Sequence, residues 1–192
     1  SGIGLSDADK VRYGEIVKRL SELTSNFSNQ LLDATQAWTK LITDEADLAG
    51  LPESALAAAK AMAEANEQTG WLFTLDFPSY LPVMTYSENR PLREECYRAF
   101  VTRASDQGPN AGEFDNTNNM NEIVALRHEI ANLLGFESYA HESLATKMAE
   151  TPEQVLGFLN ELGERSKDQA ASELAELRAF AKEHYNVTEM AS

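Results

Sequence analysis

Two stretches of the sequence, one near each end, repeat apolar residues at helical spacing over long distances. From Val11 to Ala34 such residues recur every three or four positions, and Ser6 stands where a helix N-cap is expected. A second stripe runs from Val155 to Tyr185, and Thr151-Pro152-Glu153-Gln154 before it has the pattern of a capping box. The sequence therefore predicts two long amphipathic helices, the first of more than about 25 residues and the second of over about 30.

Between these stripes lies the most apolar and aromatic part of the chain, residues 70–100. Its first residues, 71–76, alternate in the period of two that is typical of a strand, and residues 37–43 also leave the helical period. Two such strands form a ribbon too small to be stable alone, so it must pack on helices. The predicted fold is a mainly α, multi-helical body with a minor two-stranded β ribbon, about 37–43 and 71–76.

Shorter helices are predicted from start and stop signals in the rest of the chain. We expect helices at 51–68 (closed by Gly70 as the C′ residue), 78–85, 91–103 (with Pro91 as the first helical residue), 115–134 (ended by Gly135) and 137–147. Residues 105–114 have no periodicity and are rich in turn-forming residues. The expected division is a helical segment with the ribbon at 1–104, a loop or hinge at 105–114, and a helical segment at 115–192.

The charge balance excludes some classes of partner. Sixteen Lys and Arg residues stand against 31 Asp and Glu, a net charge of −15. Nucleic acid and anionic membrane surfaces are therefore not expected partners. No apolar run reaches the roughly 18 residues of a membrane helix. The acidic excess is concentrated, since residues 43–70 hold six acidic residues and one basic residue, which we interpret as solvated surface.

The single cysteine, Cys96, allows no internal disulfide, which fits a reducing compartment and a cytoplasmic location. On an amphipathic helix it is interpreted as a small buried hydrophobic residue. Four aromatic residues between the strand and the following helix could line a groove, although the core is the preferred interpretation: Trp71, Phe77, Tyr80 and Tyr86.

Few residues of the sequence indicate a catalytic or metal-binding role. His128-Glu129 and His141-Glu142 resemble the start of the zinc motif H-E-x-x-H, but Asn132 and Ala145 stand where the second histidine belongs. His184 is far downstream in the sequence. We interpret all three as surface or hydrogen-bonded histidines, and expect no catalytic residue and no metal ligand in this chain. Substrate-binding residues are not assigned by the sequence.

Six blocks in order along the chain resemble one family. They are residues 23–38, 48–52, 71–80, 89–93 (Asn89-Arg-Pro-Leu-Arg93), 125–135 and 147–152 (Lys147-Met-Ala-Glu-Thr-Pro152). In these blocks the chain is similar to the zinc-dependent oligopeptidases of the thimet-oligopeptidase group. None of the blocks is a catalytic signature, but together they span nearly the whole chain in the family's order.

The resemblance implies a longer, mostly helical, two-lobed peptidase. In that family a deep channel admits short unstructured peptides, which a zinc-bound water hydrolyses internally; two histidines, a general-base glutamate and a further glutamate lie in the C-terminal half. No residue here matches those positions. The resemblance therefore implies a scaffold or channel-wall fragment of a cytoplasmic metallopeptidase, with Ser1 and Ser192 as boundaries inside a longer protein.

Several expectations follow from that resemblance. Zinc and short peptides would be the cofactor and substrates of the parent protein, and the remainder of its own chain would be the fragment's partner. The fragment alone is expected to bind no zinc and to be inactive. Three alternatives remain open: a dipeptidyl carboxypeptidase parent, a stand-alone helical interaction module, and a small metal enzyme that uses His128 and His141.

Overall fold

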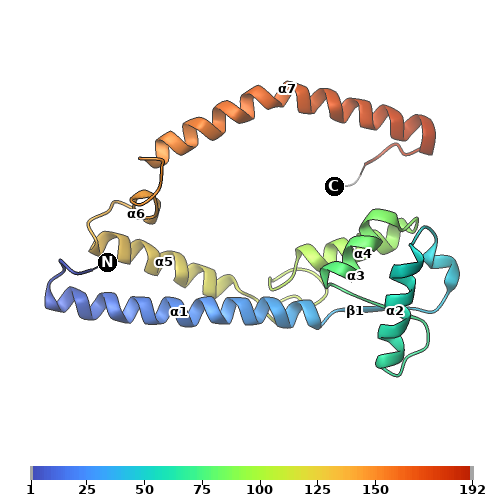
Figure 1. Ribbon diagram of the computed structural model, residues 1–192, viewed down its shortest axis with the longest axis horizontal. Helices are drawn as coiled ribbons and strands as arrows, with labels where there is room; N and C mark the ends of the chain where they lie inside the picture. The colour runs from blue at the N-terminus through green and yellow to red at the C-terminus, as the bar shows by residue number, and fades with distance from the viewer. Residues whose placement is uncertain (1, 191–192) are drawn as a thin grey trace. The chain divides into compact units, whose positions relative to one another are not determined.

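The computed structural model describes residues 2–190, and they confirm the mainly α fold with its small ribbon. The elements of this part of the chain are α1 (Asp7–Gln36), β1 (Thr39–Ile42), the 3₁₀ helix η1 (Glu45–Leu48), α2 (Glu53–Ala65), β2 (Trp71–Thr74), α3 (Phe77–Tyr86), α4 (Arg90–Val101), α5 (Thr117–Leu133), α6 (Tyr139–Leu144) and α7 (Pro152–Tyr185) (Figure 1). They fall into two compact units, Ser1–Glu129 and Ile130–Ser192, described separately below. The hinge at 105–114 stays a prediction.

Helix α1 begins as the sequence predicts, because the Asp9 amide donates to the Ser6 hydroxyl at 3.2 Å. Its buried residues are Ile16, Leu23 and Ala34, which share one side of the helix. Val11 and Val17 belong to the predicted apolar stripe but are 65% and 44% exposed. They lie about 140° and 100° around the helix from Ile16. The predicted apolar stripe is therefore wider than the buried side of α1, because neighbouring elements cover only that one side.

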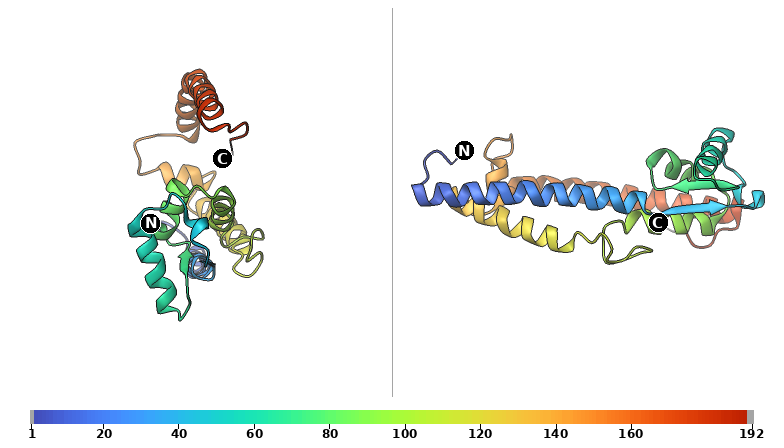
Figure 2. Two further views of the ribbon diagram at one scale, coloured as in Figure 1. Left: turned by 90° about the vertical axis from the view of Figure 1, so that its right-hand side faces the viewer. Right: turned by 90° about the horizontal axis from the view of Figure 1, so that it is seen from below.

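Part of that cover is α5, which runs antiparallel to α1 (Figures 1 and 2). Arg12 binds Glu129 through two contacts, Nε–Oε1 at 2.6 Å and Nη2–Oε2 at 2.9 Å. Seven residues further along α1, Arg19 binds Glu122 in the same way, at 2.6 and 2.8 Å. Because a heptad step on one helix meets a reverse heptad step on the other, these two bidentate pairs fix one antiparallel register.

The predicted ribbon is present at the end of α1. Strands β1 and β2 pair antiparallel, with Thr39 opposite Thr74 and Ile42 opposite Trp71. Both strands are shorter than predicted. Trp38 and Leu75, just outside them, are nevertheless buried in the core, and Asp76 stands at the N-cap position of α3.

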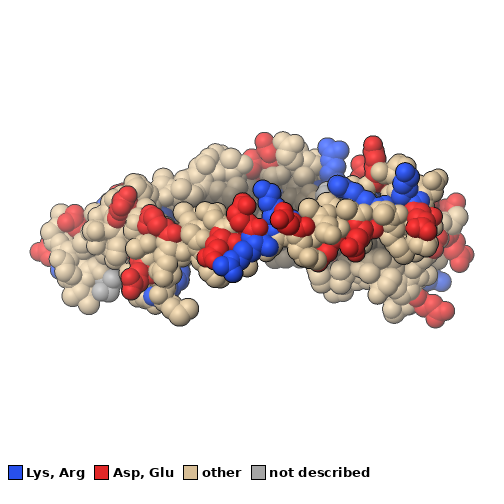
Figure 3. Space-filling model, turned by 90° about the horizontal axis from the view of Figure 1, so that it is seen from above, with Lys and Arg blue, Asp and Glu red and all other residues tan. Residues whose placement is uncertain are grey.

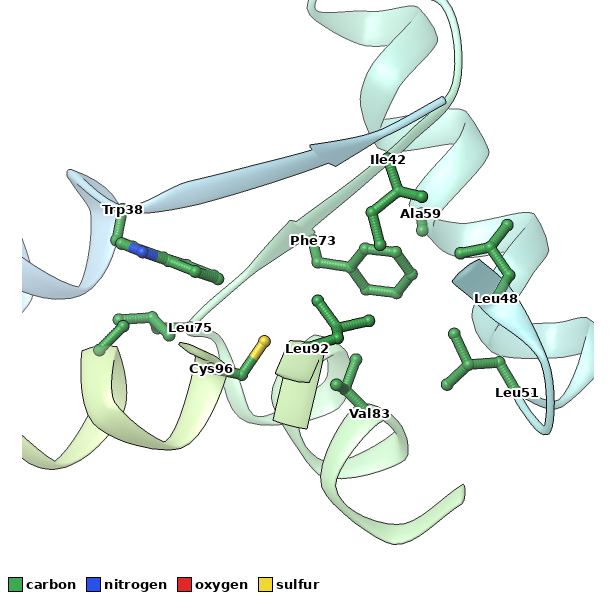
Figure 4. Packing of buried hydrophobic residues seen from close by; sticks show 11 residues of the cluster. Trp38, Ile42, Leu48, Leu51, Ala59, Phe73, Leu75, Val83, Leu92 and Cys96 are labelled. Atoms are coloured by element: carbon green, nitrogen blue, oxygen red, sulfur yellow. The ribbon is translucent and has the colours of Figure 1, made fainter. Parts of the chain in front are cut away.

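The core of the first unit is built around this ribbon. Phe73 is 1% exposed and lies among apolar side chains from α2, α3, α4 and η1, as Figure 4 shows; the cluster comprises Trp38, Ile42, Leu48, Leu51, Ala59, Phe73, Leu75, Val83, Leu92, Cys96 and Ala99. Cys96 is 2% exposed, so its predicted burial is confirmed. Burial raises the pKa of its thiol to about 12, which keeps it protonated and unreactive at neutral pH.

The end of α2 differs from the prediction. The helix stops at Ala65, and Glu67 takes the left-handed C′ position with φ 58° instead of Gly70. The Gln68 amide donates to the Ala63 carbonyl at 2.9 Å, which completes a Schellman motif. Gly70 serves a different purpose, since a Cβ there would collide with the carbonyl oxygen of Ile42 where β2 starts.

The ends of other helices differ from the predicted ends by one or a few residues. Pro91 is the second helical residue of α4, because Asn89 is its N-cap. Gly135, with φ 83°, does close α5 as predicted, and the Phe136 amide donates to the Ala131 carbonyl at 2.9 Å. Helix α6 is shorter than the predicted 137–147.

The second unit is dominated by α7, whose predicted length is confirmed at 34 residues. Thr151 caps it, with its hydroxyl accepting from the Gln154 amide at 3.2 Å. None of its residues is buried. Its apolar side chains are instead exposed: Leu156, Phe158, Leu159, Leu162, Leu174, Leu177, Phe180 and Tyr185. We call these eight side chains the α7 apolar face.

Candidate functional site

A groove of about 270 Å³ runs along β2 in the first unit. Its lining residues are Ala55, Ala58, Ala59 and Met62 of α2, Leu72, Phe73 and Thr74 of β2, and Asp76, Pro78 and Ser79 at the start of α3. Neighbouring residues of a strand point to opposite faces. Because three consecutive residues of β2 line the groove, it follows the edge of the strand and not one face of the ribbon. We call it the edge groove.

The backbone of β2 presents hydrogen-bonding groups to the edge groove. The Thr74 amide donates to the Ser79 hydroxyl at 3.0 Å, so it points away from β1. In an antiparallel ladder this orientation recurs every second residue, and Leu72 therefore also directs its N–H and C=O away from β1. Among the described residues, these two groups of Leu72 have no hydrogen-bond partner outside the ribbon.

The opposite wall is made of small side chains. Ala55, Ala58, Ala59 and Met62 stand at the i, i+3, i+4 and i+7 positions of α2, so they share one helical face. Three methyl groups leave the space that larger residues would fill. Met62 is 43% exposed, and its flexible thioether can adapt to what enters.

The end of the edge groove at α3 is acidic. Asp76 is exposed, and its Oδ2 accepts from the Thr74 hydroxyl at 3.1 Å. Although it occupies the N-cap position, its side chain makes no capping bond, and no cation pairs with it in the described part of the chain. Residues 43–70, which include α2, hold six acidic residues and one basic residue, so this part of the chain carries a net negative charge.

The histidines do not form a second site. His141 contacts the Ser138 hydroxyl through Nδ1 at 2.9 Å and Glu137 through Nε2 at 3.7 Å. The His184 ring lies 4.4 Å from that of Phe180, and His128 lies on α5 in the other unit. Within residues 2–190 no three His, Cys, Asp or Glu side chains are grouped so that they could hold a metal ion. The described residues therefore do not fit a zinc site, and the absence of catalytic residues stays a prediction.

The four aromatic candidates divide between core and surface. Trp71 and Tyr80 pack against the core, and Tyr80 stacks on Phe100 with ring centroids 4.1 Å apart. The core interpretation is wrong for Phe77 and Tyr86, which are 60% and 55% exposed. None of the four lines the edge groove. The residues that line it were not predicted from the sequence, although alanines at i, i+3 and i+4 of a helix next to a strand indicate that the two elements can approach closely.

The surface shows no separate basic patch on the face drawn in Figure 3, where Lys and Arg lie among Asp and Glu. This agrees with the net charge of −15. Among the helices of residues 2–190, none has the length and apolarity needed to cross a membrane.

Comparison with known proteins identifies the family. The chain is 68% identical over 190 residues to oligopeptidase A of Salmonella typhimurium, and this match covers 99% of the chain but 28% of that protein. It is 45% identical to the Arabidopsis thaliana protein named "Probable cytosolic oligopeptidase A", with 95% of the chain and 26% of that protein covered. It is 33% identical to a dipeptidyl carboxypeptidase of Escherichia coli, with 93% and 26% covered.

The chain thus spans little more than a quarter of the length of these relatives. A model of one family, peptidase family M3, matches residues 83–192, which include α4, α5 and α7. Together with the matches along almost the whole chain, this shows that the chain belongs to peptidase family M3.

Proposed function

We propose that the chain forms part of the helical wall of a zinc oligopeptidase that hydrolyses short peptides internally. The observation that carries this proposal is the match to oligopeptidase A, which is 68% identical over 99% of the chain and occupies 28% of that enzyme. Dipeptidyl carboxypeptidase, at 33% identity, is the less favoured parent. The buried, reduced Cys96 and the similarity to a probable cytosolic relative support a cytoplasmic location.

These 192 residues are proposed to contribute walls and packing surface, not chemistry. The sequence contains no complete H-E-x-x-H motif, and no metal-binding group is present among residues 2–190. We therefore place no catalytic step on this chain, and propose that it is inactive by itself. Zinc would belong to the remainder of the parent protein.

The remainder of the same chain is the proposed partner. The α7 apolar face supports this, because eight large apolar side chains exposed on one helix are typical of a surface that another part of a protein covers. Such a cover would explain why α7 carries large apolar side chains and yet has no buried residue.

A segment exchange tests the proposal. The 190 matching residues of Salmonella oligopeptidase A would be replaced by this chain, and cleavage of a quenched fluorescent peptide would be measured. We expect kcat/KM within about tenfold of the natural enzyme, a loss of less than about 1.4 kcal/mol in transition-state stabilisation. A chimera lacking the segment is the control and should be inactive.

The isolated chain would be assayed beside the chimera for zinc content and for hydrolysis of the same peptide. No turnover is expected. A folded, zinc-loaded chimera without activity would contradict the proposed parent. Chelator-sensitive hydrolysis by the isolated chain would contradict the proposed lack of chemistry, and would return attention to His128 and His141.

A further inference from the structure

We infer that the edge groove binds the amino-terminal end of a short, extended peptide, with its ammonium group at Asp76 and its backbone paired to Leu72. The inference rests on the proposed function for the class of ligand, a short peptide. It adds a binding site on this chain.

The shape of the groove selects the size of the ligand. Its volume of about 270 Å³ is slightly below the roughly 300 Å³ at which small-molecule sites begin. Two or three small residues fit such a space. The alanine wall of α2 gives room for a peptide backbone to approach β2, but little room for bulky side chains on that side.

The free edge of β2 favours a ligand in an extended conformation. Leu72 offers one N–H and one C=O that no group outside the ribbon satisfies within residues 2–190. An extended peptide supplies the complementary C=O and N–H. The Thr74 amide is already bonded to Ser79, so pairing is limited to the Leu72 position. Addition of a third strand also suits a two-stranded ribbon, which is the least stable kind of sheet.

The charge of Asp76 determines which end of the peptide lies next to it and in which direction the peptide runs along β2. Asp76 lies just after the carboxyl end of β2, and among residues 2–190 it has no cationic partner. A short peptide with a free amino end carries an ammonium group at neutral pH. With that group at Asp76, the peptide runs antiparallel to β2 from Asp76 towards Leu72.

Binding would be measured on the 192-residue chain with ¹⁵N chemical shifts, using trialanine with a free amino group and N-acetyl-trialanine as probes. We expect saturable shifts in α2, β2 and the start of α3 with the free peptide. Acetylation should weaken binding about fivefold, the size expected of one solvent-accessible charge pair. Equal binding of both probes, or no saturable shift at these residues, would overturn the inference.

Two variants with matched controls locate the site. Ala58→Leu fills the edge groove from an exposed position, whereas Ala57→Leu makes the same change on the same helix outside the lining. Asp76→Asn removes the charge, and Asp106→Asn removes one from the exposed 105–114 loop. Only the first member of each pair should weaken binding of free trialanine by about fivefold or more. Equal effects within a pair would remove the assignment.

The chimera distinguishes a peptide from a strand of the parent protein. If the remainder of the parent fills the groove, Ala58→Leu will lower the Tm of the chimera by several degrees and Ala57→Leu will not, and the inference fails. An unchanged Tm supports it. Peptide binding by the isolated chain beside an inactive chimera would contradict only the proposed function, while an active chimera without binding to the chain would contradict only this inference.

Discussion

The core around the β ribbon and the helix α7 contain similar apolar side chains with opposite surroundings. Phe73 of the core is 1% exposed, and Phe158 of α7 is 64% exposed. The spacing of apolar residues predicts both elements correctly as strand and helix. It does not predict burial, because burial depends on which other element lies against that face. Local sequence therefore determines the type of element, whereas the neighbouring element determines whether its apolar side chains are buried.

The stabilising contributions in the two regions should differ accordingly. Hydrophobic stabilisation follows the apolar area removed from water, so it is concentrated in the core cluster. The side-chain contacts that stabilise α7 are local. Thr151 caps the helix, Arg165 pairs with Glu161 at 2.5 Å, and Gln169 bonds Glu173 at 2.8 Å. Each of the two side-chain pairs contributes only about 0.2–0.5 kcal/mol to a helix, and the cap typically about 1 kcal/mol.

The largest expected difference comes from the same substitution made in both regions. Phe73→Ala should lower the free energy of unfolding by about 3–5 kcal/mol, because it leaves a cavity among fully buried neighbours. Phe158→Ala should change it by less than about 0.5 kcal/mol in the isolated chain. Urea denaturation followed by circular dichroism measures both values. Similar losses in the two variants would mean that the α7 apolar face is covered in the isolated chain.

The same two substitutions can be compared in the chimera with Salmonella oligopeptidase A. There, the proposed cover of α7 by the remainder of the parent protein should raise the cost of Phe158→Ala to about 2 kcal/mol or more, towards that of a buried phenylalanine. Phe73→Ala should cost the same in both settings. An unchanged effect of Phe158→Ala in the folded, active chimera would argue that another partner covers α7.

Glycine substitutions give the next largest contrast. Gly50 has φ 85°, and a Cβ there would collide with the Tyr86 carbonyl oxygen and approach the Glu88 amide nitrogen at 3.2 Å. Gly50→Ala should therefore destabilise the first unit by roughly 2 kcal/mol or more. Gly157, inside α7, has open space around it, so Gly157→Ala should instead stabilise α7 by about 0.5–1 kcal/mol.

Thermal unfolding of both variants, followed at 222 nm, measures these opposite signs. The Gly157 variant also reports on cooperativity, since it should raise the transition of α7 without moving that of the ribbon core if the two units unfold separately. A stabilising effect of Gly50→Ala would show that the chain near Tyr86 moves aside without cost.

The sequence predicts elements better than it predicts their neighbours. The Ser6 and Thr151 caps, the Gly135 stop and both strands could be read directly, because each depends on residues close in sequence. Glu67 at a left-handed position could not, since glycine is the usual residue there and Gly70 stood three residues away.

The edge groove shows the same limit for a site. Its three parts are local features: alanines on one face of α2, a short strand, and an aspartate before α3. Their convergence depends on the packing of α2 against β2, which no local pattern specifies. The exposure of Val11, Val17 and Phe77 has the same cause, because the covering element is chosen by the tertiary fold.

The smallest expected effect concerns the contact between α1 and α5. There Arg19 and Glu122 join two helices, whereas the Arg165–Glu161 pair lies within α7. A hydrogen bond from Arg19 lowers the pKa of Glu122 below its usual value. A carboxyl whose pKa is lowered by folding stabilises the native state above its unfolded pKa, and this contribution is lost as the pH falls through the folded pKa. The chain should therefore lose stability over that acidic range partly through Glu122.

Arg19→Gln removes the hydrogen bond and should flatten the dependence of unfolding free energy on pH in that range, with no change in slope at neutral pH. Carbon-13 titration of the Glu122 carboxyl would follow its pKa, which should rise towards the ordinary value in the variant. Arg165→Gln, which removes an exposed pair within α7, is the matched control and should leave the Glu122 titration unchanged.

Because both partners of the Arg19–Glu122 pair are more than 40% exposed, added salt should weaken the effect in the wild-type chain. A Glu122 pKa unaffected by Arg19→Gln would place the cause of the shift elsewhere on α5, and would leave the Arg12–Glu129 pair as the remaining electrostatic determinant of the register.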